Sequence, residues 1–123
     1  MPIERSADHP VFELGAATVT SFAAASRGAH EVSLFRVDLP PGEGLPAHRH
    51  DHLDVFTVLA GEAKFELGEE PFELGEGDSV VVPIGVRHVL EAGPGGVSII
   101  VTMLPGNQMF RDDGSVAVPP WVQ

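Results

Sequence analysis

The sequence predicts an all-β fold, a sandwich or barrel of short strands. Apolar stretches alternate with turn signals along most of its 123 residues, and 14 glycines and 11 prolines supply the turns. No segment has the spacing of an amphipathic helix, because the best candidate, residues 16–29, is rich in Thr, Ser and Gly. The apolar fraction of 43% suits a single folded domain of this length.

The apolar stretches predict strands in a defined order. Each stretch is short and is bounded by glycine or proline, which favours antiparallel strands joined by tight turns. The predicted strands are Val32–Leu39, His48–Ala60, Ala63–Leu67, Pro71–Leu74, Ser79–Pro83, Val86–Ala92 and Val97–Leu104. Residues 1–29 and 105–123 are expected to pack onto this body as arms, with Trp121, the only tryptophan, anchoring the second arm.

The front of the second predicted strand carries polar residues at even positions. Successive side chains of a strand alternate between its two faces, so these residues project to one side. They are His48, His50, His52 and Asp54. Imidazole nitrogens and a carboxylate on one face are ligands of divalent transition metals, so the pattern predicts a metal site.

The odd positions of the same strand are also mostly apolar. Leu53, Val55, Thr57 and Leu59 would face water if the other side of the sheet were open. We therefore expect that this face is covered, either by the N-terminal segment or by a second subunit. The second alternative predicts a homodimer.

Composition narrows the range of partners. Seven basic and eighteen acidic residues give a net charge of −11, which repels phosphate backbones and anionic lipid surfaces. We expect neither a nucleic-acid nor a membrane partner. The sequence shows no secretory signal and contains no cysteine, so thiolate ligands are excluded and a cytoplasmic location is expected.

Two motifs give the chain a resemblance to the cupin superfamily. The first family motif, G-x5-H-x-H-x(3,4)-E-x6-G, is matched at Gly42, His48, His50 and Gly61, with Asp54 in the place of glutamate. The second, G-x5-P-x-G-x2-H-x3-N, is matched at Gly77, Pro83, Gly85 and His88, with Ala92 in the place of asparagine. Fifteen residues separate the two motifs, as in small microbial cupins.

The resemblance implies one RmlC-like cupin domain over residues 1–123, with the motif-bearing barrel at about residues 30–104. Its fold would be a jelly-roll barrel, or double-stranded β-helix, with a metal inside. The implied ligands are His48, His50, Asp54 and His88, and the implied metal is one of Mn, Fe, Ni, Co, Cu or Zn. Because aspartate is one methylene shorter than glutamate, a three-histidine site with Asp54 behind it is a second option.

The family also implies the kinds of function to expect. The first is a small metalloenzyme of the dioxygenase, isomerase or lyase type acting on a small oxygenated substrate, with His52 at the rim as the candidate for proton transfer. The second is a small-molecule-binding or sensing protein without turnover. A metal-free sugar-binding cupin ranks last, because such proteins lose the ligand histidines. The candidate pocket walls are Phe56, Val58, Phe65, Val82, Leu90 and Met103.

Overall fold

The computed structural model describes residues 3–123; residues 1 and 2, the start of the predicted N-terminal arm, lie outside the described residues. Within 3–123, no helix has the length and apolar character needed to cross a membrane. The strands are β1 (Val11–Leu14), β2 (Ala17–Ala23), β3 (Ser33–Leu39), β4 (Gly44–His50), β5 (Asp54–Leu67), β6 (Glu70–Leu74), β7 (Ser79–Val82), β8 (His88–Met103), β9 (Met109–Arg111) and β10 (Val116–Ala117). Short 3-10 turns are η1 (Ser6–Asp8), η2 (Ala25–Arg27) and η3 (Pro120–Val122).

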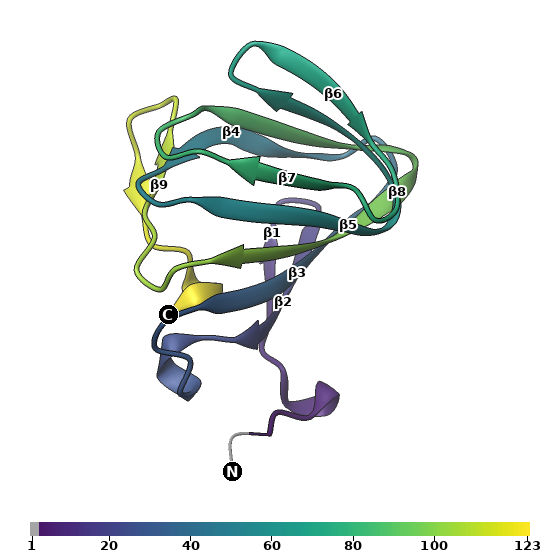
Figure 1. The fold of residues 1–123 in the computed structure, drawn as a ribbon. Coiled ribbons are helices and arrows are strands. Elements are labelled where there is room, and N and C mark those ends of the chain that lie inside the picture. Colours follow the sequence, from purple (N-terminus) through teal and green to yellow (C-terminus); the bar gives the residue numbers. More distant parts are fainter. Residues whose placement is uncertain (1–2) are drawn as a thin grey trace.

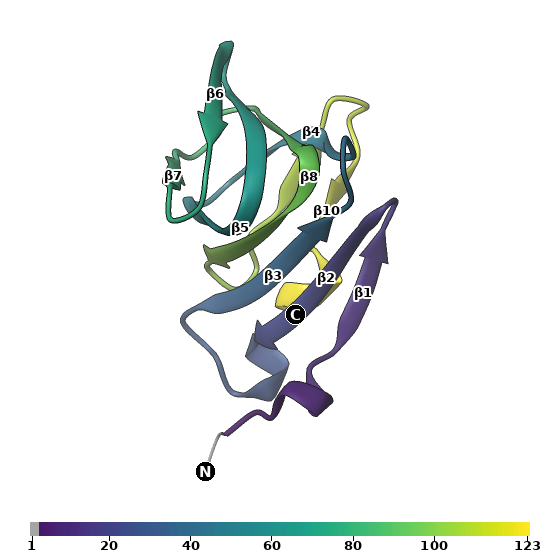
Figure 2. The ribbon, with the colours of Figure 1, turned by 90° about the vertical axis from the view of Figure 1, so that its right-hand side faces the viewer.

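Two long strands, β5 and β8, pass through both halves of the curled sheet (Figures 1 and 2). In one half, β8 lies between β3 and β5, and β2 and β7 continue the sheet outward. In the other half, β8 lies between β4 and β5, and β6 and β9 follow on either side. All of these pairings are antiparallel, and the result is the predicted all-β jelly-roll fold.

Glycines allow the two long paired strands to approach closely where they pass from one half of the sheet to the other. Gly61 of β5 has φ +81°, and a Cβ atom there would lie 2.2 Å from the carbonyl oxygen of Gly96 on β8. Only glycine fits this backbone conformation and this distance. The Gly61–Glu62 pair, expected as a turn between two strands, therefore lies inside one continuous strand.

The core fills the space between the two halves. Buried and half-buried residues alternate along β3, where Phe35 and Val37 point inward, and the same alternation places Phe56 and Ile99 in the interior. Phe65 and Leu90 face them from the other half. The histidines of both motifs lie on this inner surface, so the site is built into the packed interior.

The single strand predicted over His48–Ala60 is wrong. β4 ends at His50, the chain bends at Asp51 and His52, and β5 begins at Asp54. The Asp51 carboxylate accepts a hydrogen bond from the Gln108 main-chain N–H over 2.8 Å. Such side-chain bonds to the backbone compete with the strand ladder. The alternation rule therefore does not extend to His52.

The N-terminal segment extends the sheet instead of covering its outer face. Residues 17–23 form β2, in which Ala17, Val19 and Ser21 are buried and the threonines between them are half-buried. β-branched threonine suits such a strand. The C-terminal segment ends in η3, where Trp121 is 7% exposed and packs against the rings of Phe12 and Phe35. The C-terminal segment therefore contacts β1 and β3 through Trp121.

Candidate metal centre

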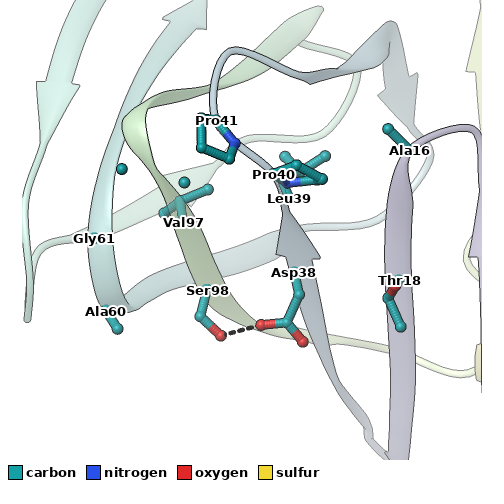
Figure 3. A pocket seen from close by; sticks show the side chains of 12 residues that line it. Ala16, Thr18, Asp38, Leu39, Pro40, Pro41, Ala60, Gly61, Val97 and Ser98 are labelled. Atoms are coloured by element: carbon teal, nitrogen blue, oxygen red, sulfur yellow. Dashed lines mark hydrogen bonds between the residues drawn. The ribbon is translucent and has the colours of Figure 1, made fainter.

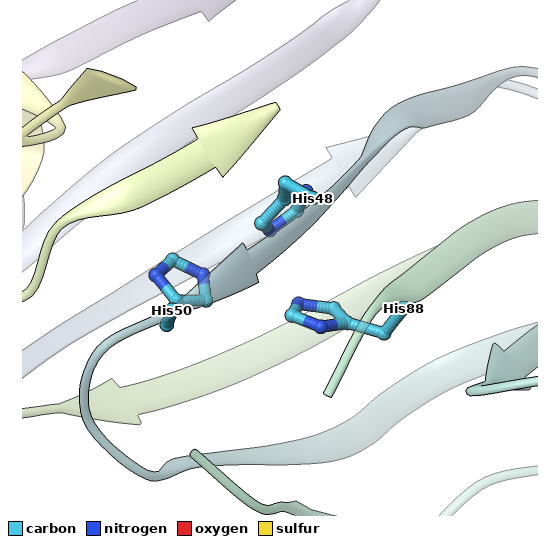
Figure 4. A group of neighbouring side chains, drawn as sticks. All are labelled: His48, His50 and His88. Carbon is cyan, nitrogen blue, oxygen red and sulfur yellow. The ribbon is translucent and has the colours of Figure 1, made fainter. Parts of the chain in front are cut away.

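Three histidines from the two motifs meet on the inner surface (Figure 4). His48 and His50 lie two residues apart on β4, and His88 is the first residue of β8, directly opposite His48 in the strand register. The ring centroid of His48 is 4.8 Å from that of His50 and 4.3 Å from that of His88. One potential ligand atom from each residue lies within 4.8 Å of the others.

Main-chain carbonyls fix the protonation pattern of these rings. The Nδ1 atom of His48 lies 2.8 Å from Pro46 O, that of His88 lies 3.0 Å from Val86 O, and that of His50 lies 3.1 Å from Gln108 O. A carbonyl only accepts, so each Nδ1 carries the hydrogen and each Nε2 presents a lone pair. Orienting partners of this kind are typical of metal-binding histidines.

Burial keeps the three imidazoles neutral. Desolvation, followed by repulsion from His48, lowers the pKa of His50 to about 4 and that of His88 to about 3. Desolvation also lowers the pKa of His48. Neutral imidazoles bind a metal without first losing a proton, so the group is ready to ligate at neutral pH.

Asp54 is fully buried beside this group. Its Oδ2 atom is 3.0 Å from His50 Nε2, but the two atoms do not form a hydrogen bond, and Oδ2 has no other partner. Burial raises the pKa of Asp54 to about 7, and the Asn107 amide opposes that rise. Asp54 does not belong to the group whose ligand atoms all lie within 4.8 Å of one another.

The unpartnered atoms fit a cation. His88 Nε2 is buried without a hydrogen-bond partner, as is Asp54 Oδ2. Asp54 Oδ2 and His50 Nε2, 3.0 Å apart, are close enough for both to reach one metal at ordinary ligand distances of about 2.0–2.2 Å. Lone pairs left without donors in a dry interior are costly, and a divalent metal would satisfy them. The residues present therefore fit the predicted metal.

Asn107 is a site residue that the sequence reasoning missed. It lies in the loop between β8 and β9, is fully buried, and donates from Nδ2 to Asp54 Oδ1 over 2.8 Å. The next residue, Gln108, supplies the carbonyl that faces His50 Nδ1. Asn107 belongs to neither motif, and no spacing in the sequence relates it to Asp54.

His52 lies apart from the three clustered histidines. Its side chain is 41% exposed at the bend between β4 and β5, and its Nδ1 atom is 2.9 Å from Asp51 Oδ1. His52 therefore lies at the surface, in the loop that leads into Asp54.

An apolar cavity of about 40 Å³ adjoins the histidines, with room for about three water molecules. His48 and His50 line it together with apolar side chains, which include the predicted walls Phe56, Leu90 and Met103 and also Trp121. The other predicted walls, Val58, Phe65 and Val82, are buried in the core and do not line the cavity. Phe65 nevertheless stacks on the His88 ring, with ring centroids 5.9 Å apart.

A larger groove of about 420 Å³ lies on the other side of the sheet (Figure 3). Its carboxylate, Asp38, already accepts hydrogen bonds from Ser98 Oγ and from Arg36 Nε. No histidine lines this groove. The chemistry-bearing side chains therefore gather at the cavity inside the fold.

The sequence model of one family, described as "Cupin domain", matches residues 35–103. Mannose-1-phosphate guanylyltransferase ManC from Salmonella typhimurium is 34% identical over 80 residues, which cover 63% of this chain and 16% of that protein. The chain thus spans about a sixth of the length of this relative.

Solved structures with the same fold include proteins of similar size. The polyketide cyclase RemF from Streptomyces resistomycificus is 21% identical with a TM-score of 0.75, covering 87% of this chain and 83% of that chain. An RmlC-like cupin from Shewanella frigidimarina is 24% identical with a TM-score of 0.72, covering 89% and 92%. At these identities the likeness shows the fold.

Proposed function

The chain belongs to the cupin domain family, and from this premise we propose that it binds a divalent transition metal and acts as a small metalloenzyme. The proposed reaction is of the dioxygenase, isomerase or lyase type, and the substrate is a small oxygenated organic molecule. The observation that carries the proposal is the set of three buried histidines whose Nδ1 atoms all face main-chain carbonyls. Their Nε2 lone pairs are left for a metal.

The proposed ligands are His48, His50 and His88, with Asp54 as the fourth. Nitrogen donors with one carboxylate suit Mn, Fe, Ni, Co, Cu and Zn. When bound, the metal supplies a Lewis acid with positions open to substrate oxygen. The protein's own residues would hold it in a buried environment in which electrostatic interactions are strong.

Other side chains support substrate handling. The cavity beside His48 and His50 is lined mostly by apolar groups, which disfavour water next to the histidines. Trp121 lines the same cavity, and its buried Nε1–H has no acceptor, so a substrate oxygen could accept from it. At the rim, Asp51 orients the His52 ring, and we propose His52 as the proton carrier.

A binding or sensing protein without turnover is the second candidate. The cavity measures about 40 Å³, whereas pockets for organic ligands usually measure about 300–1,000 Å³, so its size does not separate this function from the enzyme. The retained histidines speak against a metal-free sugar-binding cupin.

Turnover by the metal-loaded protein separates these functions. Oxygen uptake and product formation are measured with catechols, diketones and thiols; diketones also suit a fold shared with a polyketide cyclase. Turnover that is lost in His88→Ala supports the enzyme. Ligand-induced change at the metal without turnover supports the sensing function, and a protein that takes up no metal contradicts both.

We also propose a homodimer formed through the outer face of β5 and β7. Val55 of β5 lies opposite Val81 of β7 in the register, and Leu59 and Val81 are 53% and 57% exposed. Within residues 3–123, nothing covers this apolar face, since the N-terminal segment continues the sheet. A second copy would bury it. A cytoplasmic location and the lack of a nucleic-acid partner stay predictions from composition.

A further inference from the structure

We propose that Asn107 is a positioning residue that holds the Asp54 carboxylate in place as a metal ligand. The Asp54–Asn107 pair would then replace the longer glutamate of the cupin pattern. The inference rests on the metal site proposed above. It concerns how this chain compensates for a ligand that is one methylene shorter.

The two oxygens of Asp54 have different surroundings. Asn107 Nδ2 donates to Oδ1 over 2.8 Å, whereas Oδ2 has no hydrogen-bond partner and lies 3.0 Å from His50 Nε2. The carboxylate is planar and rigid, so fixing Oδ1 also fixes the direction of Oδ2. The amide thus prevents a rotation of the carboxylate that would turn Oδ2 away from the histidines.

The fold brings Asn107 to this position from a distant part of the sequence. Asp54, the first residue of β5, pairs with Met103, the last residue of β8. The loop that follows Met103 therefore leaves the sheet beside Asp54. The Asn107 N–H donates to Leu104 O, which closes this loop into a tight turn, and the side chain is fully buried.

The same loop orients a second ligand. Gln108 O faces His50 Nδ1 at 3.1 Å, so neighbouring residues of one loop fix the directions of both Asp54 and His50. Asn107 is suited to its part because its amide nitrogen donates without adding a charge. A carboxylate at position 107 would repel Asp54, and an apolar side chain would leave Oδ1 unpartnered.

Cobalt(II) binding by the full chain tests this role through affinity and the visible spectrum, which reports the number and type of ligands. Asn107→Leu keeps the branched shape and the number of side-chain heavy atoms but removes the donor. We expect 10- to 100-fold weaker binding and a changed spectrum. In an Asp54→Ala background, Asn107→Leu should cause a much smaller loss, because most of its effect passes through Asp54 and only its contact with His50 remains. Asp54→Glu combined with Asn107→Ala should recover affinity, since the longer carboxylate reaches the metal without the amide.

The outcomes distinguish this role from a structural one. If Asn107→Leu is folded by circular dichroism and binds cobalt as the wild type does, the inference is wrong while the metal site stands. Equal losses from Asn107→Leu with and without Asp54 also overturn it, because they show a general effect on packing. If Asn107→Leu does not fold, the cobalt affinity of the Asp54→Glu/Asn107→Ala variant tests the proposal instead. A cobalt affinity as low as that of Asp54→Ala contradicts it. A wild type that binds no cobalt overturns the metal site and this inference together.

Discussion

His48 and His88 lie directly opposite each other on the antiparallel strands β4 and β8, with ring centroids 4.3 Å apart. Each belongs to a different motif of the sequence, and the strand pairing joins the motifs into one site. Both Nδ1 atoms face the carbonyl of the residue two positions earlier, Pro46 and Val86. In both cases a main-chain carbonyl two residues before the histidine therefore orients the ring.

His52 is predicted to act in proton transfer and not in metal binding. His52→Ala should keep the wild-type metal content, because the residue lies outside the histidine group. On an active substrate, its turnover should fall by about 10²- to 10⁴-fold. Metal analysis and steady-state kinetics check both expectations, with the exposed His30→Ala as control. Unchanged turnover, or loss of metal, contradicts this role.

The metal-free protein should lose stability as the pH falls from 7 toward 4. The folded-state pKa values of His50 and His88, about 4 and 3, and the lowered pKa of His48 lie below the ordinary value of 6.5. The unfolded chain therefore takes up these protons first as the pH falls. Asp54 acts in the opposite direction, because its pKa of about 7 exceeds the ordinary 3.8.

Three histidines outweigh one carboxylate in this balance. Near pH 5 the unfolded chain binds roughly one to two more protons at these four groups, which corresponds to about 1.5 to 3 kcal/mol per pH unit. Urea unfolding at several pH values, in the presence of a chelator, measures how steeply the free energy of unfolding changes with pH. In the double variant His50→Leu/His88→Leu the free energy of unfolding should depend less on pH. The same pH dependence in the wild type and in this variant would contradict the conclusion that His50 and His88 cause it.

Gly61 should tolerate substitution much less than a glycine with positive φ that has open space around it. Gly61→Ala places a Cβ atom 2.2 Å from Gly96 O at φ +81°, so we expect a loss of about 3 to 5 kcal/mol in the free energy of unfolding. Gly68→Ala, at φ +63° with no atom within 4 Å of the added Cβ, should cost about 1 to 2 kcal/mol. Chemical denaturation measures the free energy of unfolding of both variants. Equal losses would contradict the conclusion that the close approach of β5 and β8 requires glycine at position 61.

The outer face should carry the dimer contact. Val81→Arg places a charge on this face and should shift the protein from dimer to monomer in light scattering after size exclusion. Phe72→Arg is the matched control, because Phe72 is an exposed apolar residue on β6, outside the proposed contact. A monomeric wild type, or a Val81→Arg variant that stays dimeric, contradicts the interface.

Much of the fold and the three clustered histidines could be predicted from local patterns. Glycine and proline mark the turns, and the alternation of side chains places His48 and His50 on one face of β4. The second motif supplied His88. These features depend on residues close together in the sequence, so they can be recognised without knowing which distant residues come into contact.

The rest depends on contacts between distant residues. The bend that removes His52 from the strand depends on Asp51 meeting Gln108, 57 positions away. Asn107 reaches Asp54 over a separation of 53 positions. Trp121 lines the cavity because the C-terminal turn folds back onto it, whereas Val58 and Val82, which are as apolar as the residues that line the cavity, are buried elsewhere in the core. Hydrophobicity identifies buried residues but does not say which of them border a cavity.

The most direct test of the metal centre is the metal content of the purified protein, measured by elemental analysis for the wild type and for His88→Ala. We predict about one equivalent of a divalent transition metal per chain in the wild type, or after loading with Mn, Fe, Co, Ni, Cu or Zn. His88→Ala should hold almost none while keeping its β-sheet circular dichroism. A wild type that takes up no metal, or a His88→Ala variant that keeps a full equivalent, would contradict the account.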